Sequence, residues 1–331
     1  MKIGLVFLRV TVIQMVLAAQ SFALQPDASA GKPAEPPAGA QAGEGVYTTA
    51  DQLLEALEKA DVGLRTLTAD IRYDRVFEIA GDRQIRDGSL VFVDDRGEAR
   101  DAKGAEGEGA AGSRRFAIHI KSVQIGDRRD AEDRWLIFDG EWFVERLDAQ
   151  KQFTKRRVAR PGEHFDPLRL GEGPFPLPIG QKKSDIVSRY DVELLPATQD
   201  LKPNDPEDAA AQKALDGFVK GCYQLKLTPK ESIRKGEELR EIRLWYRAGS
   251  GAKGEATLLP RMARTVNRAG DVTLVQLINV KVNEPVDEGV TSTATPKGDW
   301  KVQIEDLAPA GEPQALEVPG REPSSAQTGG K

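Results

Sequence analysis

Apolar and polar residues alternate along several stretches of the chain, and the longest alternation covers residues 67–79. The odd-numbered positions from Leu67 to Ile79 are apolar except for Arg75, and the positions between them are mostly polar. A period of two is typical of a β-strand with one buried face. Neighbouring strands in this part of the chain are expected to pair antiparallel, because their connections are short. The same alternation predicts further strands at residues 88–92, 116–120, 223–227, 242–246 and 272–280.

Two aromatic-rich runs, residues 134–138 and 142–146, flank the dipeptide Asp139-Gly140. Asp-Gly between β-prone runs is a strong hairpin signal, because the turn needs positive φ and glycine supplies it without steric cost. A second turn and a third β-prone run follow directly, so we predict an antiparallel meander. Trp135 and Trp142 are then expected on an apolar sheet face, which has to be covered by a helix, by another sheet or by a ligand.

Leucines recur at helical spacing between residues 50 and 64, directly after a capping-box pattern made by Thr49 and Gln52. We predict an amphipathic helix there, and it needs an apolar partner surface because a helix this short is marginal alone. A second short helix is expected at residues 181–189. Residues 164–180 are apolar but rich in Pro and Gly, which excludes a strand or an ordinary helix. They form either an ordered loop over an apolar opening or a loop packed on the core.

These elements predict a mainly β (α+β) fold: a curved antiparallel sheet of about ten or eleven strands that forms an unclosed β-barrel, with the first helix against its concave face. We place a single domain at residues 48–306. Polar insertions at about residues 96–113 and 197–214 interrupt it, and we interpret both as solvated. A linker at residues 24–47 and a tail at residues 307–331 have the composition of disordered segments.

The N-terminus has the pattern of a secretory signal peptide over residues 1–23. Met1-Lys2 is a short basic start, the following residues are mostly apolar, and Ser21-Phe22-Ala23 fits a small-x-small cleavage site. We predict cleavage after Ala23 and export to the periplasm. An uncleaved anchor is the alternative, although Arg9 leaves only a short apolar run for a membrane span.

Composition narrows the function classes further. The chain has one cysteine, Cys222, which cannot form an internal disulfide, so stability has to come from burial. The net charge of −5 argues against a nucleic-acid partner, which favours a basic face.

The sequence offers no constellation typical of catalysis. Its two histidines, His119 and His164, lie in separate contexts, and His119 is expected on the polar face of a strand. We find no Gly-x-Ser-x-Gly elbow, no His-Glu-x-x-His pair, no cysteine cluster and no phosphate-binding glycine fingerprint with the right flanks. The adjacent carboxylates of Asp94-Asp95 are expected to point apart into water. We therefore predict no enzymatic activity, no metal and no cofactor, and we favour binding or carriage.

Several short motifs follow the first helix and the long two-faced strand in a fixed order, namely Gly88-x-Leu90, Asp139-Gly140-x-Trp142, Gln152-Phe153-Thr154, Leu225-x-Leu227-x-Pro229-Lys230, Ile242-x-Leu244-Trp245, Leu259-Pro260-Arg261 and Asn279-Val280-Lys281-Val282-Asn283. This ordered set, together with the signal peptide, resembles the outer-membrane lipoprotein carrier (LolA) family and its lipoprotein-sorting relatives. The resemblance covers residues 49–305 at the level of pattern.

The resemblance implies an unclosed barrel with a helical lid and an apolar cavity that shields acyl chains from water. It also implies, as partners, an inner-membrane transporter that supplies acylated lipoproteins and an outer-membrane acceptor. Carriers of this family often have an Arg-Pro pair after the second strand, and that Arg helps to hold the lid closed. Here the region reads Val93-Asp94-Asp95-Arg96, so no lid-locking Arg is carried over. The chain is also longer than a typical carrier, which indicates a divergent branch.

We therefore expect a monomeric, exported carrier of lipid or lipoprotein acyl chains. The alternative is a non-catalytic lipid sensor or interaction protein on the same fold. The lid candidates are Leu53, Leu57, Phe165, Leu168, Phe175 and Leu177. Inward alternation gives the candidate residues of the apolar cavity: Ile71, Tyr73, Phe77, Leu90, Phe92, Phe116, Ile118, Trp135, Trp142, Leu225, Leu227 and Leu244.

Overall fold

The computed structural model describes residues 47–95, 114–158, 170, 179, 182–203, 208–236, 238–250 and 256–306. The chain divides into two compact units, Met1–Gln41 and Ala42–Lys331, and every described residue belongs to the second unit. The predicted signal peptide, the tail, the first insertion and His164 lie outside the described residues. So do four of the lid candidates, Phe165, Leu168, Phe175 and Leu177.

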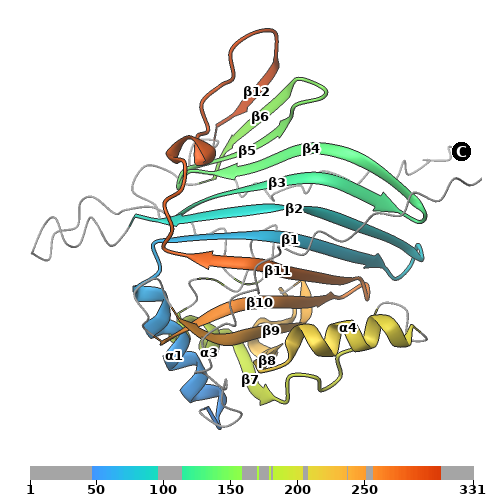
Figure 1. Cartoon of the computed structure of the whole chain (residues 1–331), viewed down its shortest axis with the longest axis vertical. Helices are drawn as coiled ribbons and strands as arrows, with labels where there is room; N and C mark the ends of the chain where they lie inside the picture. Colours follow the sequence, from blue (N-terminus) through green and yellow to red (C-terminus); the bar gives the residue numbers. More distant parts are fainter. Residues whose placement is uncertain are drawn as a thin grey trace, which may run out of the picture. The chain divides into compact units, whose positions relative to one another are not determined.

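The described residues form one twelve-stranded sheet in the order β12-β6-β5-β4-β3-β2-β1-β11-β10-β9-β8-β7 (Figure 1). All neighbouring strands pair antiparallel except β12 and β6, which are parallel. The two edge strands, β12 and β7, do not pair with each other, so the predicted mainly β, unclosed sheet is confirmed. The strands are β1 (Thr66–Phe77), β2 (Asp82–Asp94), β3 (Arg114–Ile125), β4 (Arg128–Phe138), β5 (Trp142–Leu147), β6 (Gln152–Arg157), β7 (Tyr190–Leu195), β8 (Cys222–Pro229), β9 (Leu239–Ser250), β10 (Ala256–Asn267), β11 (Val272–Val282) and β12 (Lys301–Glu305).

Short helices accompany the sheet: α1 (Ala50–Val62), α3 (Lys183–Arg189), α4 (Ala209–Val219), α5 (Glu231–Arg234) and the 3-10 helix η1 (Glu288–Thr291). The predicted N-cap of α1 is confirmed, because the Thr49 hydroxyl accepts a hydrogen bond from the Gln52 backbone N–H at 3.2 Å. The reciprocal bond of a capping box differs by one residue. The Gln52 side-chain oxygen accepts from the N–H of Thr48, at 3.0 Å.

The predicted meander is confirmed in β4, β5 and β6. At its first turn Gly140 has a φ of 108°, the positive value for which glycine is suited. The Asp139 carboxylate accepts hydrogen bonds from the backbone N–H groups of Glu141 and Trp142, at 3.0 and 2.7 Å. The Asp-Gly pair thus fixes the turn through both the glycine backbone and the aspartate side chain.

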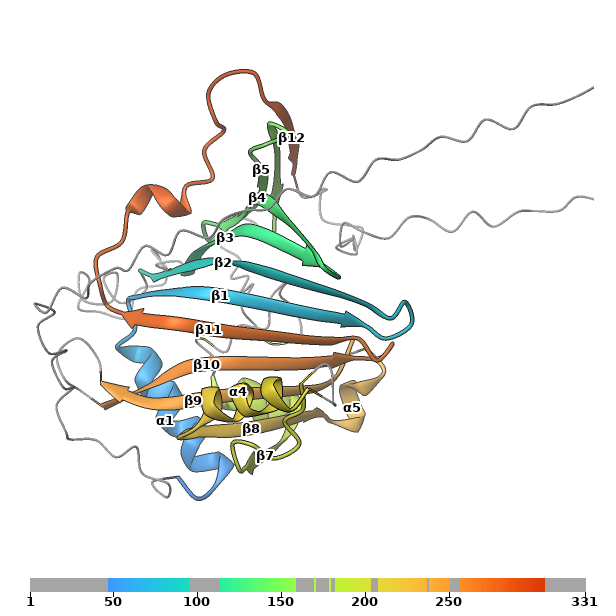
Figure 2. The same cartoon turned by 45° about the vertical axis from the view of Figure 1, so that its right-hand side comes forward.

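The sheet has two covered faces, which we name after the helices on them. The α1 face carries alternate residues such as Ile71, Phe92 and Leu244, and the α4 face carries their neighbours, such as Trp245 and Met262. Strand β9 is buried on both sides, because α1 packs against one face and α4 against the other (Figures 1 and 2).

Residues 197–214, interpreted as a solvated insertion, are mostly exposed in the part that the structure describes, although the segment is also anchored on the sheet. Leu201 is buried, and α4 buries Leu215 and Val219 against Trp245 on the α4 face. The Trp245 indole N–H donates to the Ala197 carbonyl at 2.7 Å. Nothing in the sequence pattern indicated this anchoring, because the segment is held largely through backbone carbonyls, which leave no trace in side-chain pattern.

Candidate functional site

The α1 face brings together nine of the twelve predicted cavity residues. Six lie in a cluster on β1–β4 and β11, which we call the strand cluster: Ile71, Tyr73, Leu90, Phe92, Phe116 and Ile118. Three lie in a second cluster, formed by α1, α3 and β8–β10, which we call the helix cluster: Leu225, Leu227 and Leu244. Eight of these nine residues are buried, and Tyr73 is half-buried. Their binding of a ligand stays a prediction.

Trp135 and Trp142 lie on the opposite face of the sheet, so placing them inside an apolar cavity was wrong. Trp135 is paired in register with His119 and stacks on its ring, with centroids 4.0 Å apart. The cations of Lys155 and Arg157 lie over the Trp142 ring at 4.7 and 4.6 Å. The α1-face positions of β4 and β5 are taken by residues such as Leu136, Phe138 and Phe143.

Phe77 lies at the end of β1, and the structure assigns it to neither cluster. It is half-buried, and the Arg75 guanidinium lies over its ring at 4.4 Å. That guanidinium also pairs with Asp271 at 3.2 Å, so Phe77 belongs to a polar edge of the α1 face rather than to its apolar interior.

Helix α1 covers the helix cluster with a narrow apolar stripe. Leu53 and Leu54 are buried, and Leu57 is half-buried against the same cluster. The predicted lid residues Leu53 and Leu57 therefore both face the sheet. Burying a leucine side chain contributes about 1.5–3 kcal/mol, so α1 is held by a few such contacts and not by a large interface.

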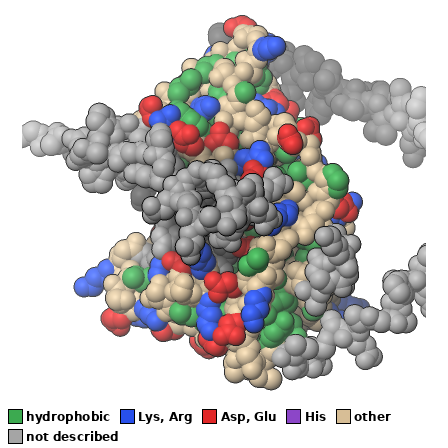
Figure 3. All heavy atoms as spheres, turned by 90° about the vertical axis from the view of Figure 1, so that its left-hand side faces the viewer, with side chains coloured by type: hydrophobic (Ala, Val, Ile, Leu, Met, Phe, Trp, Pro, Cys, Tyr) green, Lys and Arg blue, Asp and Glu red, His purple; other side chains and the backbone are tan. Residues whose placement is uncertain are grey.

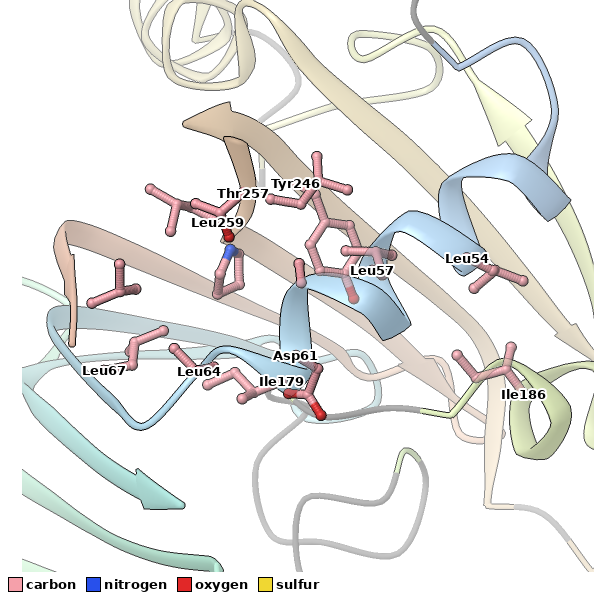
Figure 4. Close-up of a pocket in the computed structure, with 14 residues that line it drawn as sticks. Leu54, Leu57, Asp61, Leu64, Leu67, Ile179, Ile186, Tyr246, Thr257 and Leu259 are labelled. Atoms are coloured by element: carbon pink, nitrogen blue, oxygen red, sulfur yellow. The ribbon is translucent and has the colours of Figure 1, made fainter. Parts of the chain in front are cut away.

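An apolar pocket lies where α1 meets β10 and the strand cluster (Figure 4). Leu57 of α1 lies beside the Tyr246 ring, Leu54 lies near Ile186 of α3, and Asp61 stands at the end near Leu64 (Figure 4). The cavity has a volume of about 40 Å³, whereas ligand pockets are typically about 300–1,000 Å³. In this state the pocket has room for about one water molecule and not for an acyl chain.

Ion pairs fix both ends of α1. Near its C-terminus, the Asp61 carboxylate lies 2.9 Å from the Arg114 guanidinium of β3, which also lies 3.6 Å from Asp94 of β2. Near its N-terminus, the Lys183 amine of α3 lies 2.5 Å from Asp51 and 2.9 Å from Glu55. Hydrogen bonds to Asp51 and Glu55 raise the pKa of the Lys183 amine. Arg114 thus occupies the position of a helix latch, and sequence pattern gave no signal for it.

Tyr246 adds a buried hydroxyl to the pocket wall. Burial, and then the nearby negative charge of Asp61, raise the pKa of the Tyr246 phenol well above its ordinary value. The phenol therefore stays neutral at every physiological pH. It gives the wall one polar atom without adding a charge.

Two residues of the Pro- and Gly-rich segment 164–180 are described, and both are buried on the α1 face. Leu170 packs into the helix cluster and Ile179 into the strand cluster. The Leu170 carbonyl accepts hydrogen bonds from the Arg189 guanidinium at 2.9 Å and from the Tyr190 hydroxyl at 3.3 Å. Leu170 and Ile179 both belong to the connection between β6 and β7, two strands that lie near opposite edges of the sheet. Its two described residues show that it contacts the α1 face.

The α1 face carries charged side chains toward the turn between β1 and β2. Arg86 pairs with Glu132 at 3.0 Å, and Arg134 pairs with Glu145 at 2.7 Å and with Glu132 at 3.8 Å. The register places Arg86 beside Tyr73 and Arg134 beside Ile120, on the α1 face. A half-buried network of alternating charge therefore borders the strand cluster, where alternation alone suggested an apolar wall.

No group of three metal-ligating side chains occurs among the residues that the structure describes. His119, expected on a polar face, bonds to the Asp133 carboxylate at 2.7 Å. Acidic and basic side chains are interspersed over the face of the molecule shown in Figure 3. Within the described part of the chain, no helix is long and apolar enough to cross a membrane.

No protein-family model matches the chain, and no curated protein matches it. Several solved structures are similar in fold. An uncharacterized conserved protein from Thermus thermophilus matches with a TM-score of 0.37 and 10% identity, over 78% of this chain and 99% of its own. A putative outer membrane lipoprotein-sorting protein domain from Vibrio parahaemolyticus matches with a TM-score of 0.32 and 12% identity, over 72% and 94% of the two chains.

A LolA superfamily protein from Nitrosomonas europaea matches with a TM-score of 0.31 and 11% identity, over 74% of this chain and 99% of its own. Two of these three structures therefore carry the names of the family that the sequence resembles. At such TM-scores the likeness carries no argument about function, which has to be made from the α1 face itself.

Proposed function

We propose that this protein is an exported carrier that binds the acyl chain of a lipid or lipoprotein on its α1 face. The proposal rests on how that face is covered. A continuous apolar surface on eight strands is packed, among the described residues, by α1, by Ile186 of α3, and by Leu170 and Ile179.

The energies favour exchange of the cover for a ligand. Each buried methylene of an acyl chain gains about 0.8 kcal/mol, so a chain of about 14 methylenes gains about 11 kcal/mol if it is fully buried. The two buried leucines of α1 contribute about 1.5–3 kcal/mol each. An acyl chain can therefore displace the α1 stripe and recover more than the helix loses.

The pocket of about 40 Å³ between α1 and β10 is the point of entry in this proposal. It lies at the junction of the helix cluster and the strand cluster, so displacement of α1 opens a path along both. Carriage also requires release, and an apolar wall without a strong specific contact allows it. The Arg114–Asp61 pair holds α1 in place until the ligand arrives.

Export and transfer belong to the same proposal. The N-terminal pattern Met1 to Ala23 supports secretion to the periplasm. There the carrier takes its ligand from an inner-membrane donor and yields it to an outer-membrane acceptor, without chemistry of its own.

The test compares two charged substitutions on α1. Leu57→Glu puts a carboxylate into the pocket wall, whereas Val62→Glu puts the same group on a side chain that is 65% exposed. Burying a charge without a partner is costly, so we expect Leu57→Glu to weaken binding of a fluorescent fatty acid at least about tenfold and Val62→Glu to leave it unchanged.

Native mass spectrometry of the wild-type protein, purified from its own envelope, completes the test. We expect bound lipid or acylated peptide that is lost in Leu57→Glu. Absence of any such ligand, together with no fatty-acid binding in vitro, would overturn the proposal. Retained lipid binding without transfer between membranes would favour the lipid-sensor alternative.

A further inference from the structure

The edge strand β12 is unusually exposed for a paired strand. Residues Lys301 to Ile304 are all exposed, and Val302 and Ile304 are 43% and 59% accessible. These two are among the most accessible large apolar side chains in the described residues. A sheet edge with apolar side chains and unpaired peptide groups is a template for pairing with another strand. Figure 1 shows β12 at one end of the sheet, beside β6.

The backbone of β12 offers its free groups in a fixed pattern. The Lys301 N–H donates to the Lys151 carbonyl at 2.8 Å, and the parallel register runs from Lys301 opposite Gln152 to Glu305 opposite Arg156. Peptide groups alternate in direction along a strand. Lys301, Gln303 and Glu305 therefore direct theirs toward β6, and Val302 and Ile304 direct theirs toward solvent.

We propose that β12 is a self-association edge, on which the β12 strand of a second copy of this chain pairs antiparallel about a two-fold axis at Gln303. In this register Val302 lies opposite Ile304 of the second copy as a hydrogen-bonded pair, and the reverse pair is identical by symmetry. All four outward-facing peptide groups of Val302 and Ile304 are then satisfied.

The side chains fit the same register. Lys301 lies opposite Glu305 of the second copy in a non-hydrogen-bonded pair, where side chains approach most closely. Two opposite-charge pairs therefore flank the centre. Val302 and Ile304 of both copies share one face of the new ladder, the face on which Val302 lies beside Phe153. A shift of two residues in either direction loses both charge pairs.

Glu305 already has partners within its own chain, and these position it at the edge. Its carboxylate lies 2.6 Å from the Arg156 guanidinium and accepts from the Gln303 amide at 2.6 Å. A carboxylate has about four lone-pair sites, so it can also accept from Lys301 of a second copy. The pairing is short compared with standard interfaces, so the association is weak and depends on concentration. It revises the expectation of a strictly monomeric protein.

The experiment uses two charge variants of the full chain, measured alone and mixed, by sedimentation over micromolar to millimolar concentrations. Lys301→Glu places two carboxylates opposite each other at both ends of the pair, and Glu305→Lys places two amines there. We expect each variant alone to dimerise about tenfold more weakly than wild type. In the mixture every Glu faces a Lys, so an equimolar mixture regains association. Lys213→Glu on α4, an exposed charge change far from β12 in sequence, is the control.

A second variant tests the backbone bonds. Ile304→Pro removes one outward N–H without touching a bond to β6, and proline is tolerated on edge strands. It should abolish dimerisation while the unfolding midpoint stays close to that of wild type. The proposal fails if wild type is monomeric throughout the range. It also fails if the dimer survives in Ile304→Pro, or if the mixture of charge variants associates no better than each alone.

Discussion

The α4 face and the α1 face of this sheet are covered in different ways. On the α4 face the cover is tied to the sheet by buried polar bonds. The Gln224 amide, which is fully buried, donates to the carbonyls of Pro196, Ala197 and Gln199 at 2.8–3.2 Å. Arg243 adds a bond to the Gln199 carbonyl at 3.1 Å.

On the α1 face, helix α1 is held by a leucine stripe and by an ion pair at each of its ends. Buried hydrogen bonds are expensive to break, because each opened group loses its partner without regaining water. Apolar contacts can be exchanged for other apolar contacts at little net cost. Under the proposed function, we therefore expect the α4 cover to stay closed and helix α1 to be the part that a ligand displaces.

The largest expected effect comes from Trp245→Ala on the α4 face. The substitution removes a fully buried ring and its bond to Ala197, so the free energy of unfolding should fall by about 3–5 kcal/mol in urea denaturation. Fatty-acid binding per folded molecule should not change. Trp142→Ala is the control. Its ring is half-buried and contacts mainly cations, so it should lose much less.

Leu53→Ala sharpens the comparison from the other side. Leu53 of α1 is fully buried in the helix cluster, and its truncation should cost about 2–4 kcal/mol. If α1 opens separately from the sheet, the loss appears as faster hydrogen exchange in α1 while the β-strands keep their protection. Uniformly faster exchange throughout the sheet would instead mean that α1 and the core open together.

Alternation along the sequence predicted some strand positions on the α1 face and misplaced others. Alternation placed Ile71 and Tyr73 correctly in the strand cluster, because both are apolar positions between polar ones. It failed for Trp135, because Trp135 to Phe138 are apolar without a gap and both faces of this part of β4 are covered. Periodicity cannot assign a face to such a run.

The remaining features had no side-chain signal. Pairing of β12 with β6 depends on contacts between distant segments. The Arg114 latch was missed because its partners Asp61 and Asp94 come from two other elements of the sequence.

Asp61→Asn should have a smaller effect. It removes one charge from a partly buried pair with Arg114, which should free α1 by about 1 kcal/mol. The expected result is about fivefold faster uptake of a fluorescent fatty acid in stopped flow, with little change in urea denaturation. Glu58→Gln, an exposed change on the same helix, is the control and should leave uptake unaltered. Slower uptake in Asp61→Asn would contradict the latch.

The smallest effect concerns alkaline pH. The Lys183 amine has a raised pKa because of its bonds to Asp51 and then Glu55. Its contribution to α1 docking is therefore complete below its ordinary pKa and is lost as pH rises through the raised value. Fatty-acid uptake should accelerate in wild type above about pH 10.5. Lys183→Met should be faster at neutral pH, and the difference between the two proteins should close at alkaline pH. A constant difference at all pH values would exclude this role.

Pulsed electron spin resonance can report separately whether α1 and α4 move when a ligand binds the α1 face. In a Cys222→Ser background, spin labels at Val62 and Ile125 report on α1, and labels at Ala214 and Ile125 report on α4. All three labelled positions are exposed. If a ligand displaces α1, we expect an excess of fatty acid to shift the Val62–Ile125 distance distribution and to leave the Ala214–Ile125 distribution unchanged. Saturating ligand with both distributions unchanged, or movement of α4 alone, would contradict it.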